Sequence, residues 1–117
     1  MNTKINLTYK GVDYTLEYDR MSVKLLENQG FSLQEFAQKP MSNIDLAFAG
    51  SFIKNHRKVS QNIIDEIYSK MKDKESLIQV LSTMISECYE SLMEEPKDDS
   101  GNISWEAVGL TPTKENK

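Results

Sequence analysis

INLTYKGVDYTLEYD, residues 5–19, alternates apolar and polar side chains on both sides of a Lys10-Gly11 pair. Alternation with a period of two, in β-branched and aromatic residues, is typical of half-buried β-strands. Gly11 supplies the positive φ angle that a tight turn between two strands requires. The stretch therefore predicts a β-hairpin over residues 4–18, at the head of a chain whose other patterns are helical.

An isolated two-stranded hairpin is only marginally stable in water. Its apolar face must cover a helix, or its exposed edge must pair with another chain. We expect the hairpin to pack on the domain's own helices and to leave one edge free for intermolecular contact. The face expected to pack consists of Ile5, Leu7, Tyr14 and Leu16.

Two short helices are expected directly after the hairpin. Residues 19–27 form the first, with an aspartate as N-cap, and Gly30 ends it. The second begins with a capping box made by Ser32 and Glu35. Pro40 stops this second helix, because proline cannot donate the backbone hydrogen bond that a helix interior needs.

Two longer amphipathic helices are predicted next. Ser42 and Asp45 have the spacing that opens the third helix, and Ser60 can cap the fourth. One face of the third carries Ile44, Ala47, Phe48, Ser51 and Phe52. The inward face of the fourth carries Ile63, Ile64, Ile67, Tyr68 and Met71. Both sets have the three-and-four spacing of a helix with one buried stripe.

The fifth and longest predicted helix runs from about Lys74 to Glu95. Its apolar residues step by three and four and form a heptad seam: Ile78, Leu81, Ile85, Cys88 and Leu92, widened by Leu77, Met84 and Tyr89. Two heptads are too few for a coiled coil that stands alone. The seam either packs within the domain or also accepts a second helix from another protomer.

The predicted fold class is mainly α with an N-terminal β-hairpin, a small α+β domain with about five helices. One domain covers residues 1–95, and residues 96–117 form a flexible acidic tail that contains two of the three prolines. Within the tail, residues 103–108 hold the chain's one tryptophan, Trp105. A lone aromatic in such a tail either anchors a partner or folds back on its own domain.

The composition indicates a small globular protein of a reducing compartment. The chain of 117 residues carries 27% charged residues and a net charge of −4, and its one cysteine, Cys88, cannot form an internal disulfide. Residues 1–4 lead into the first strand without the apolar run of a signal peptide, and no stretch is long and apolar enough to span a bilayer. We therefore expect a cytoplasmic protein with no membrane partner.

The residues that could carry chemistry are few. His56 is the one histidine, and with Lys54, Arg57 and Lys58 it forms the chain's one basic cluster, at a predicted helix end. Cys88 lies on a different helix, and no glycine-rich phosphate loop is present. We expect no enzyme activity, no cofactor and no metal. The negative net charge also disfavours nucleic-acid binding.

Three runs carry a resemblance to a known family. They are YKGVDYTLEYDRMSVKLLENQGF at residues 9–31, NIDLAFAGSFIKNHRKVS at residues 43–60 and LIQVLSTMISECYESL at residues 77–92. In this order, with Gly101, Asn102 and Trp105, the chain resembles the tail assembly chaperones of siphophages and prophages of Gram-positive bacteria. The likeness covers residues 1–108.

The resemblance implies a helper protein without active-site residues. Such a chaperone coats the long helical tape measure protein in the cytoplasm of the infected or lysogenic host and is not expected in the mature virion. A longer, frameshifted form contacts the tail tube protein. The alternative is a small phage regulatory protein, either DNA-binding or inhibiting a host enzyme, built on the third and fourth helices.

Self-association is expected to be head-to-tail and partly electrostatic. The last helix carries five acids and no base between Glu75 and Glu95, and the basic cluster at residues 54–58 belongs to another element. Pairing such unlike surfaces joins copies in series. The candidate residues for partner binding or self-association are Phe48, Phe52, Arg57, Lys58, Met84, Glu87, Glu94 and Trp105.

Overall fold

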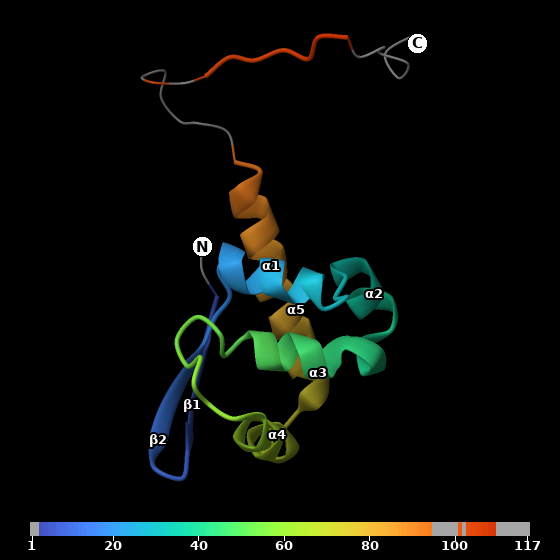
Figure 1. The fold of residues 1–117 in the computed structure, drawn as a ribbon. Coiled ribbons are helices and arrows are strands. Elements are labelled where there is room, and N and C mark those ends of the chain that lie inside the picture. The colour runs from blue at the N-terminus through green and yellow to red at the C-terminus, as the bar shows by residue number, and fades with distance from the viewer. Residues whose placement is uncertain (1–2, 95–100, 102, 110–117) are drawn as a thin grey trace.

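The predicted hairpin and five helices are all present in a computed structural model that describes residues 3–94, 101 and 103–109 (Figure 1). The fold class expected from the sequence is therefore confirmed for these residues. In chain order the elements are β1 Ile5–Tyr9, β2 Val12–Leu16, α1 Arg20–Asn28, α2 Leu33–Gln38, α3 Pro40–Gly50, α4 Gln61–Lys70 and α5 Lys74–Leu92.

The hairpin forms as predicted, with β1 and β2 paired antiparallel. Ile5 lies opposite Leu16 and Leu7 opposite Tyr14, which places the expected apolar residues on one face. Lys10 and Gly11 have φ angles of 51° and 79°, so both turn residues are left-handed, as a type I′ turn requires. The sequence indicated this conformation for the glycine only.

Polar side chains cap the helices largely where the sequence placed them. Asp19 accepts a 2.8 Å hydrogen bond from the backbone N–H of Ser22, and the Ser22 hydroxyl accepts one from the Asp19 N–H in return. Ser32 and Ser60 each accept a hydrogen bond from the N–H three residues on, at 3.3 Å. For Ser32 this is one half of the predicted capping box, because Glu35 does not return a hydrogen bond.

The predicted start of the third helix is wrong. Helix α3 begins at Pro40, and Ser42 lies within its first turn instead of capping it. Proline suits the first helical position, because its φ angle is already helical and an N–H there would have no helical partner. Pro40 therefore follows the end of α2 at Gln38 and is the first residue of α3.

The core lies where α5 packs against α1, α2 and α3 and beneath the apolar face of the hairpin. On α5 the buried side chains are Leu77, Leu81, Met84 and Ile85. The predicted seam is therefore slightly rotated, since Ile78 is only half-buried. Helix α5 ends at Leu92, short of the predicted Glu95, and its last turns extend past the other helices (Figure 1), so that Leu92 is 53% exposed.

The hairpin packs on the domain as expected. Tyr14 and Leu16 are buried, and Ile5 and Leu7 are partly buried against the core. The loop after α3 covers the outer edge of β2: the N–H of Thr15 donates to Nε2 of His56 at 2.9 Å. On the outer edge of β1, the backbone groups of Asn6 and Thr8 form no hydrogen bond with another described residue, so this edge is free as predicted.

Most of the predicted flexible tail, residues 96–117, lies outside the described residues, so its mobility stays a prediction. Residues 103–109 are described and form neither helix nor strand. Among the helices that the structure describes, none combines the length and the apolar character needed to cross a membrane.

Candidate functional site

Three of the predicted partner-binding residues are part of the core. Phe48 and Phe52 are 1% exposed and Met84 is 2% exposed. The two phenylalanine rings pack at 5.3 Å between centroids, and Tyr14 of β2 packs on Phe52 at 5.9 Å. Phe48 also packs on Tyr68 of α4 at 5.3 Å between ring centroids, so these rings fill the interior of the domain. These three side chains are unavailable at the surface of the folded monomer.

The basic cluster lies in the loop after α3, because the helix ends at Gly50. Lys54 donates to the Glu17 carboxylate at 3.0 Å. Arg57 and Lys58 are exposed, and neither forms an ion pair within the part of the chain that the structure describes. Two of the predicted site residues therefore present positive charge to solvent, while Lys54 holds the loop on the hairpin.

His56 also serves the fold. Its ring accepts the hydrogen bond from Thr15 and packs edge-on against Tyr14 at 5.1 Å between ring centroids. Asn55 donates to the Thr15 carbonyl at 3.0 Å. Side chains of the loop thus pair with the backbone of β2 much as a third strand would.

Two hollows meet beside this loop. One, of about 680 Å³, is lined by Asp19, Met21, Ile53, Lys54, Asn55, His56, Arg57, Lys58 and Val59. The other, of about 210 Å³, is lined by Leu26, Gln29, Leu46, Ala49, Gly50, Ile53, Gln61 and Ile64. They share Ile53 and together form one shallow surface, which we call the α1–α3 face.

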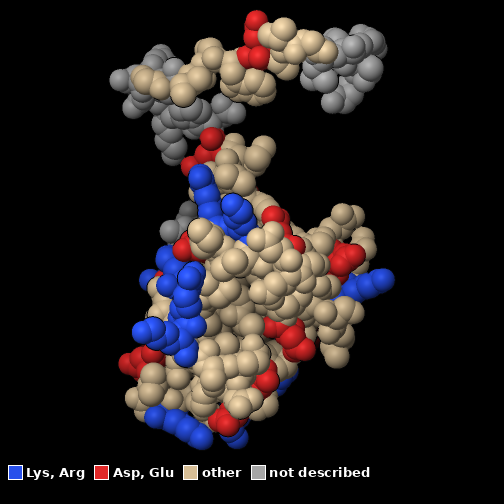
Figure 2. Space-filling view, in the orientation of Figure 1, with Lys and Arg blue, Asp and Glu red and all other residues tan. Residues whose placement is uncertain are grey.

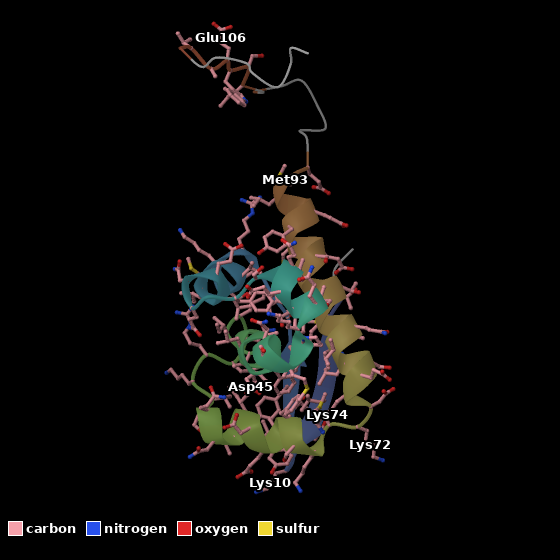
Figure 3. The ribbon with its side chains drawn as sticks, turned by 90° about the vertical axis from the view of Figure 1, so that its right-hand side faces the viewer. Lys10, Asp45, Lys72, Lys74, Met93 and Glu106 are labelled. Atoms are coloured by element: carbon pink, nitrogen blue, oxygen red, sulfur yellow. The ribbon has the colours of Figure 1, made fainter. Side chains whose placement is uncertain are left out.

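The charges of the α1–α3 face lie in its larger hollow, which includes Asp19, Lys54, Arg57 and Lys58, whereas no charged residue lines the smaller hollow. Figure 2 shows a broad area over α1, α3 and α4 with few charged side chains, and Lys and Arg gather along its left edge. Figure 3, turned by 90°, shows Asp45 on the side of this face and α5 on the opposite side of the molecule. Leu46, Ala49 and Ile53 are half-buried, so part of their apolar surface meets solvent. A face of this kind suits an apolar partner.

A second apolar hollow, the α1–α5 groove, lies on another side of the domain. It has a volume of about 350 Å³ and is lined by Arg20, Val23, Lys24, Glu27, Cys88, Tyr89 and Leu92. The Tyr89 hydroxyl donates to the Glu27 carboxylate. Burial, followed by this contact, raises the pKa of Tyr89 to about 12.

Sequence reasoning found one wall of the α1–α5 groove and missed the other. Cys88, Tyr89 and Leu92 belong to the predicted apolar stripe of the last helix, which was expected to leave room for a further element. The helical spacing of Val23 on α1 was a signal for the second wall. Which two helices become neighbours depends on tertiary packing, which the spacing does not contain.

The two acidic site residues have different surroundings. The backbone N–H and the hydroxyl of Thr3 both donate to Glu87, each at 2.8 Å, and these bonds lower the pKa of its carboxyl group. Glu87 therefore fastens the start of β1 to α5, and its prediction as a charge for a neighbouring copy is not supported by this geometry. Glu94 is exposed just after the end of α5.

Trp105 is almost fully solvent-exposed. It is 83% exposed, and Ile103 and Val108 are 85% and 87% exposed. Of the two readings left open by the sequence, this structure shows the one in which the segment does not fold back on its own domain.

The described residues offer little for metal or nucleophilic chemistry. No three of their His, Cys, Asp or Glu side chains gather closely enough to hold a metal ion. Burial raises the pKa of the Cys88 thiol, which lies in the α1–α5 groove, whereas His56 packs on the hairpin.

A family model described as Domain of unknown function (DUF5055) matches residues 1–108. The chain belongs to the DUF5055 family. A search of curated proteins and a search of solved structures each find no match. The DUF5055 match spans the hairpin, all five described helices and Trp105. The α1–α3 face, the α1–α5 groove and the exposed C-terminal segment therefore all lie within the region that defines the family.

Proposed function

We propose that this protein is a tail assembly chaperone of a siphophage or prophage, which self-associates and coats the tape measure protein to keep it soluble. The resemblance of residues 1–108 to such chaperones motivates the proposal. The α1–α3 face is the single structural observation that supports it best. The chaperone would act in the cytoplasm of the infected or lysogenic host and would leave before the virion matures.

The α1–α3 face has the properties that this task needs. A tape measure protein long enough to set tail length exposes apolar stripes of helix, and exposed apolar stripes aggregate. A shallow surface with Leu46, Ala49 and Ile53 can accept the apolar side of such a helix, as helix-in-groove complexes do. Because no charged side chain lines the smaller hollow, this part of the face can tolerate helices of varied sequence.

The methionines contribute less to this surface than their sequence positions suggested. Met84 is buried in the core, Met71 caps the end of α4, and Met93 is exposed at the tip of α5 (Figure 3). They do not share one groove. Among the methionines that the structure describes, Met21 lines the α1–α3 face and is 55% exposed, so it is placed to adapt to a helix there.

Co-expression with the tape measure protein tests the proposal. The wild-type chain should keep the partner in the soluble fraction, and Ala49→Glu should lose this effect because it places a charge within the apolar face. Met41→Glu is the matched control, since it adds the same charge to an exposed position on the same helix, outside both hollows. A partner that is equally soluble with either variant, or without the chaperone, would rule the proposed face out.

A longer form of the protein would connect the coat to the tail tube protein, as the resemblance implies. The C-terminal end of α5 projects from the domain (Figure 1), so a continuation of the chain would start away from the α1–α3 face. Pull-down of the tail tube protein by the longer form, and not by the 117-residue chain, is the expected result.

A further inference from the structure

We propose that residues 103–108 of one copy dock into the α1–α5 groove of a second copy. This inference rests on the proposed function, because copies that coat one partner must contact one another. It assigns that contact to residues 103–108 of one copy and the α1–α5 groove of the next. Three observations carry it: an exposed apolar segment, an open apolar groove, and opposite charge on the two.

The segment has the pattern of an extended ligand. Residues 103–107 read Ile-Ser-Trp-Glu-Ala, so an extended backbone places Ile103 and Trp105 on one side and Ser104 and Glu106 on the other. Ile103, Trp105 and Val108 are each more than four-fifths exposed. A cluster of large apolar side chains in water marks a binding element, and tryptophan is among the residues that most often anchor interfaces.

The groove offers a fitting place for Trp105. Its volume of about 350 Å³ is large enough for an indole ring, and its walls are the side chain of Val23, the ring of Tyr89 and the exposed Leu92. An aromatic neighbour adds a directional contact to the apolar burial. The groove is open at the surface, so a segment can enter it without displacing a core side chain.

Charge complements the apolar fit. Arg20 and Lys24 stand four residues apart on α1 and both line the groove. The chain from Glu94 to Glu106 carries five acids and one base, a net charge of −4. Glu27 is the one acid in the groove lining, and its carboxylate already accepts from Tyr89. A docked segment would therefore lie beside two cations that attract it.

The occupant is a second copy because, in the single chain, the segment leaves the groove open and contacts little of its own domain. The eight residues 95–102 can span up to about 26–29 Å, which is enough to reach a neighbour. Segment and groove are different surfaces, so each copy can give one and receive one, and copies join in series. A six-residue segment buries far less than the roughly 800 Å² per partner of a standard interface, so each contact is weak and gains strength from many copies.

Fluorescence of the one tryptophan reports docking directly, in the absence of any tape measure protein. We expect the emission of Trp105 to shift to shorter wavelength as protein concentration rises, in parallel with sedimentation of larger species. Trp105→Ala should weaken association by at least about tenfold. A blue shift independent of concentration would show that the segment folds back on its own copy, and the absence of any shift up to concentrations where oligomers form would also overturn the proposal.

Charge reversal tests the groove. Arg20→Glu with Lys24→Glu should reduce both the fluorescence shift and the oligomers. Lys70→Glu with Lys72→Glu is the matched control, because it makes the same change in charge at exposed positions around the connection between α4 and α5. Equal effects of the two double variants would show that only net charge matters, which contradicts docking at the groove.

A disulfide trap locates the contact. Ile103→Cys, which lies on the same side of the extended segment as Trp105, should give with the native Cys88 in the groove a ladder of covalent oligomers on mild oxidation. The same variant with Cys88→Ser should stop at dimers, and an internally cross-linked monomer would contradict the second-copy arrangement. These results do not depend on the tape measure protein: failure here with a soluble co-expressed partner overturns the inference alone, and an insoluble partner with an intact ladder overturns the proposed function alone.

Discussion

At Gly50 the backbone of α3 approaches α1 so closely that no side chain fits between them. A Cβ atom there would lie 2.7–2.9 Å from three side-chain atoms of Leu26, which is itself buried. All three atoms belong to the branched end of the leucine, so the side chain would have to move as a unit within a packed core. One glycine thus sets the distance between the two helices that carry the α1–α3 face.

Gly50→Ala should therefore destabilise the protein. Alanine favours a helix over glycine by about 1 kcal/mol, but overpacking against Leu26 costs about 1–3 kcal/mol. We expect a net loss in the free energy of unfolding, measured by denaturant titration. Ser42→Ala, at an exposed position in the same helix, is the control and should change it little. A more stable Gly50→Ala variant would show that Leu26 and α1 can shift away from the added methyl group at little cost in free energy.

Acid should weaken the attachments of the hairpin. The pKa of Glu87 lies below its ordinary value of 4.5 because of the two hydrogen bonds from Thr3, and that of Glu17 is lowered first by Asn55 and then by Lys54. A carboxyl group with a folded pKa below its unfolded pKa stabilises the fold above the unfolded value, and this contribution is lost as pH falls through the folded value.

The free energy of unfolding should therefore decline as pH falls below about 4.5. Glu87→Gln should make this decline shallower, because the side chain no longer titrates. Thr3→Val should also make it shallower, because it removes the hydroxyl that donates to Glu87. Unfolding titrations at several pH values measure the slope. A slope unchanged by both substitutions would show that the contact between Thr3 and Glu87 does not form in solution.

At the scale of elements, the sequence predicted most of the fold because local patterns decide it. The hairpin follows from alternation and a turn glycine, and the starts of α1, α2 and α4 follow from their capping side chains. The start of α3 was missed because Pro40 is compatible with both the end of one helix and the first turn of the next. The rotation of the buried stripe on α5 could not be predicted, since it depends on which helices pack against it.

The hairpin offers a matched pair of substitutions within one strand. Leu16 is fully buried and Val12 is 50% exposed, although both lie on the apolar face of β2. Leu16→Ala should cost about 2–5 kcal/mol because it leaves a cavity against the helices, and Val12→Ala should cost much less. Thermal unfolding of both variants checks the difference. Equal, small losses would mean that the hairpin is only loosely attached.

At the scale of the whole molecule, the candidate site was predicted only in part. An apolar helical stripe looks the same whether it meets the core or a partner, so Phe48, Phe52 and Met84 were assigned to a surface that the fold does not expose. Arg57, Lys58 and Trp105 are exposed, and their assignment to partner binding or self-association stays a prediction. The α1–α3 face and the α1–α5 groove each combine residues from separate elements, so they form only in the folded structure.

Nucleic-acid binding separates the chaperone from the alternative, a small regulatory protein. The net charge is −4, and Lys54 is already paired with Glu17, which leaves Arg57 and Lys58 as the lysine and arginine of the loop without an ion pair among the described residues. We expect no shift of duplex DNA in a gel assay at physiological salt. A shift that is abolished by Arg57→Glu with Lys58→Glu would favour the regulator.

The mass of the complex with the tape measure protein tests the proposed coat most directly. Fragments of the tape measure protein of two lengths, one twice the other, would be co-purified with the chaperone and measured by size-exclusion chromatography with light scattering. A coat predicts several chaperone copies on the shorter fragment and about twice as many on the longer. One copy on both fragments, or fragments that stay soluble and monomeric alone, would contradict it.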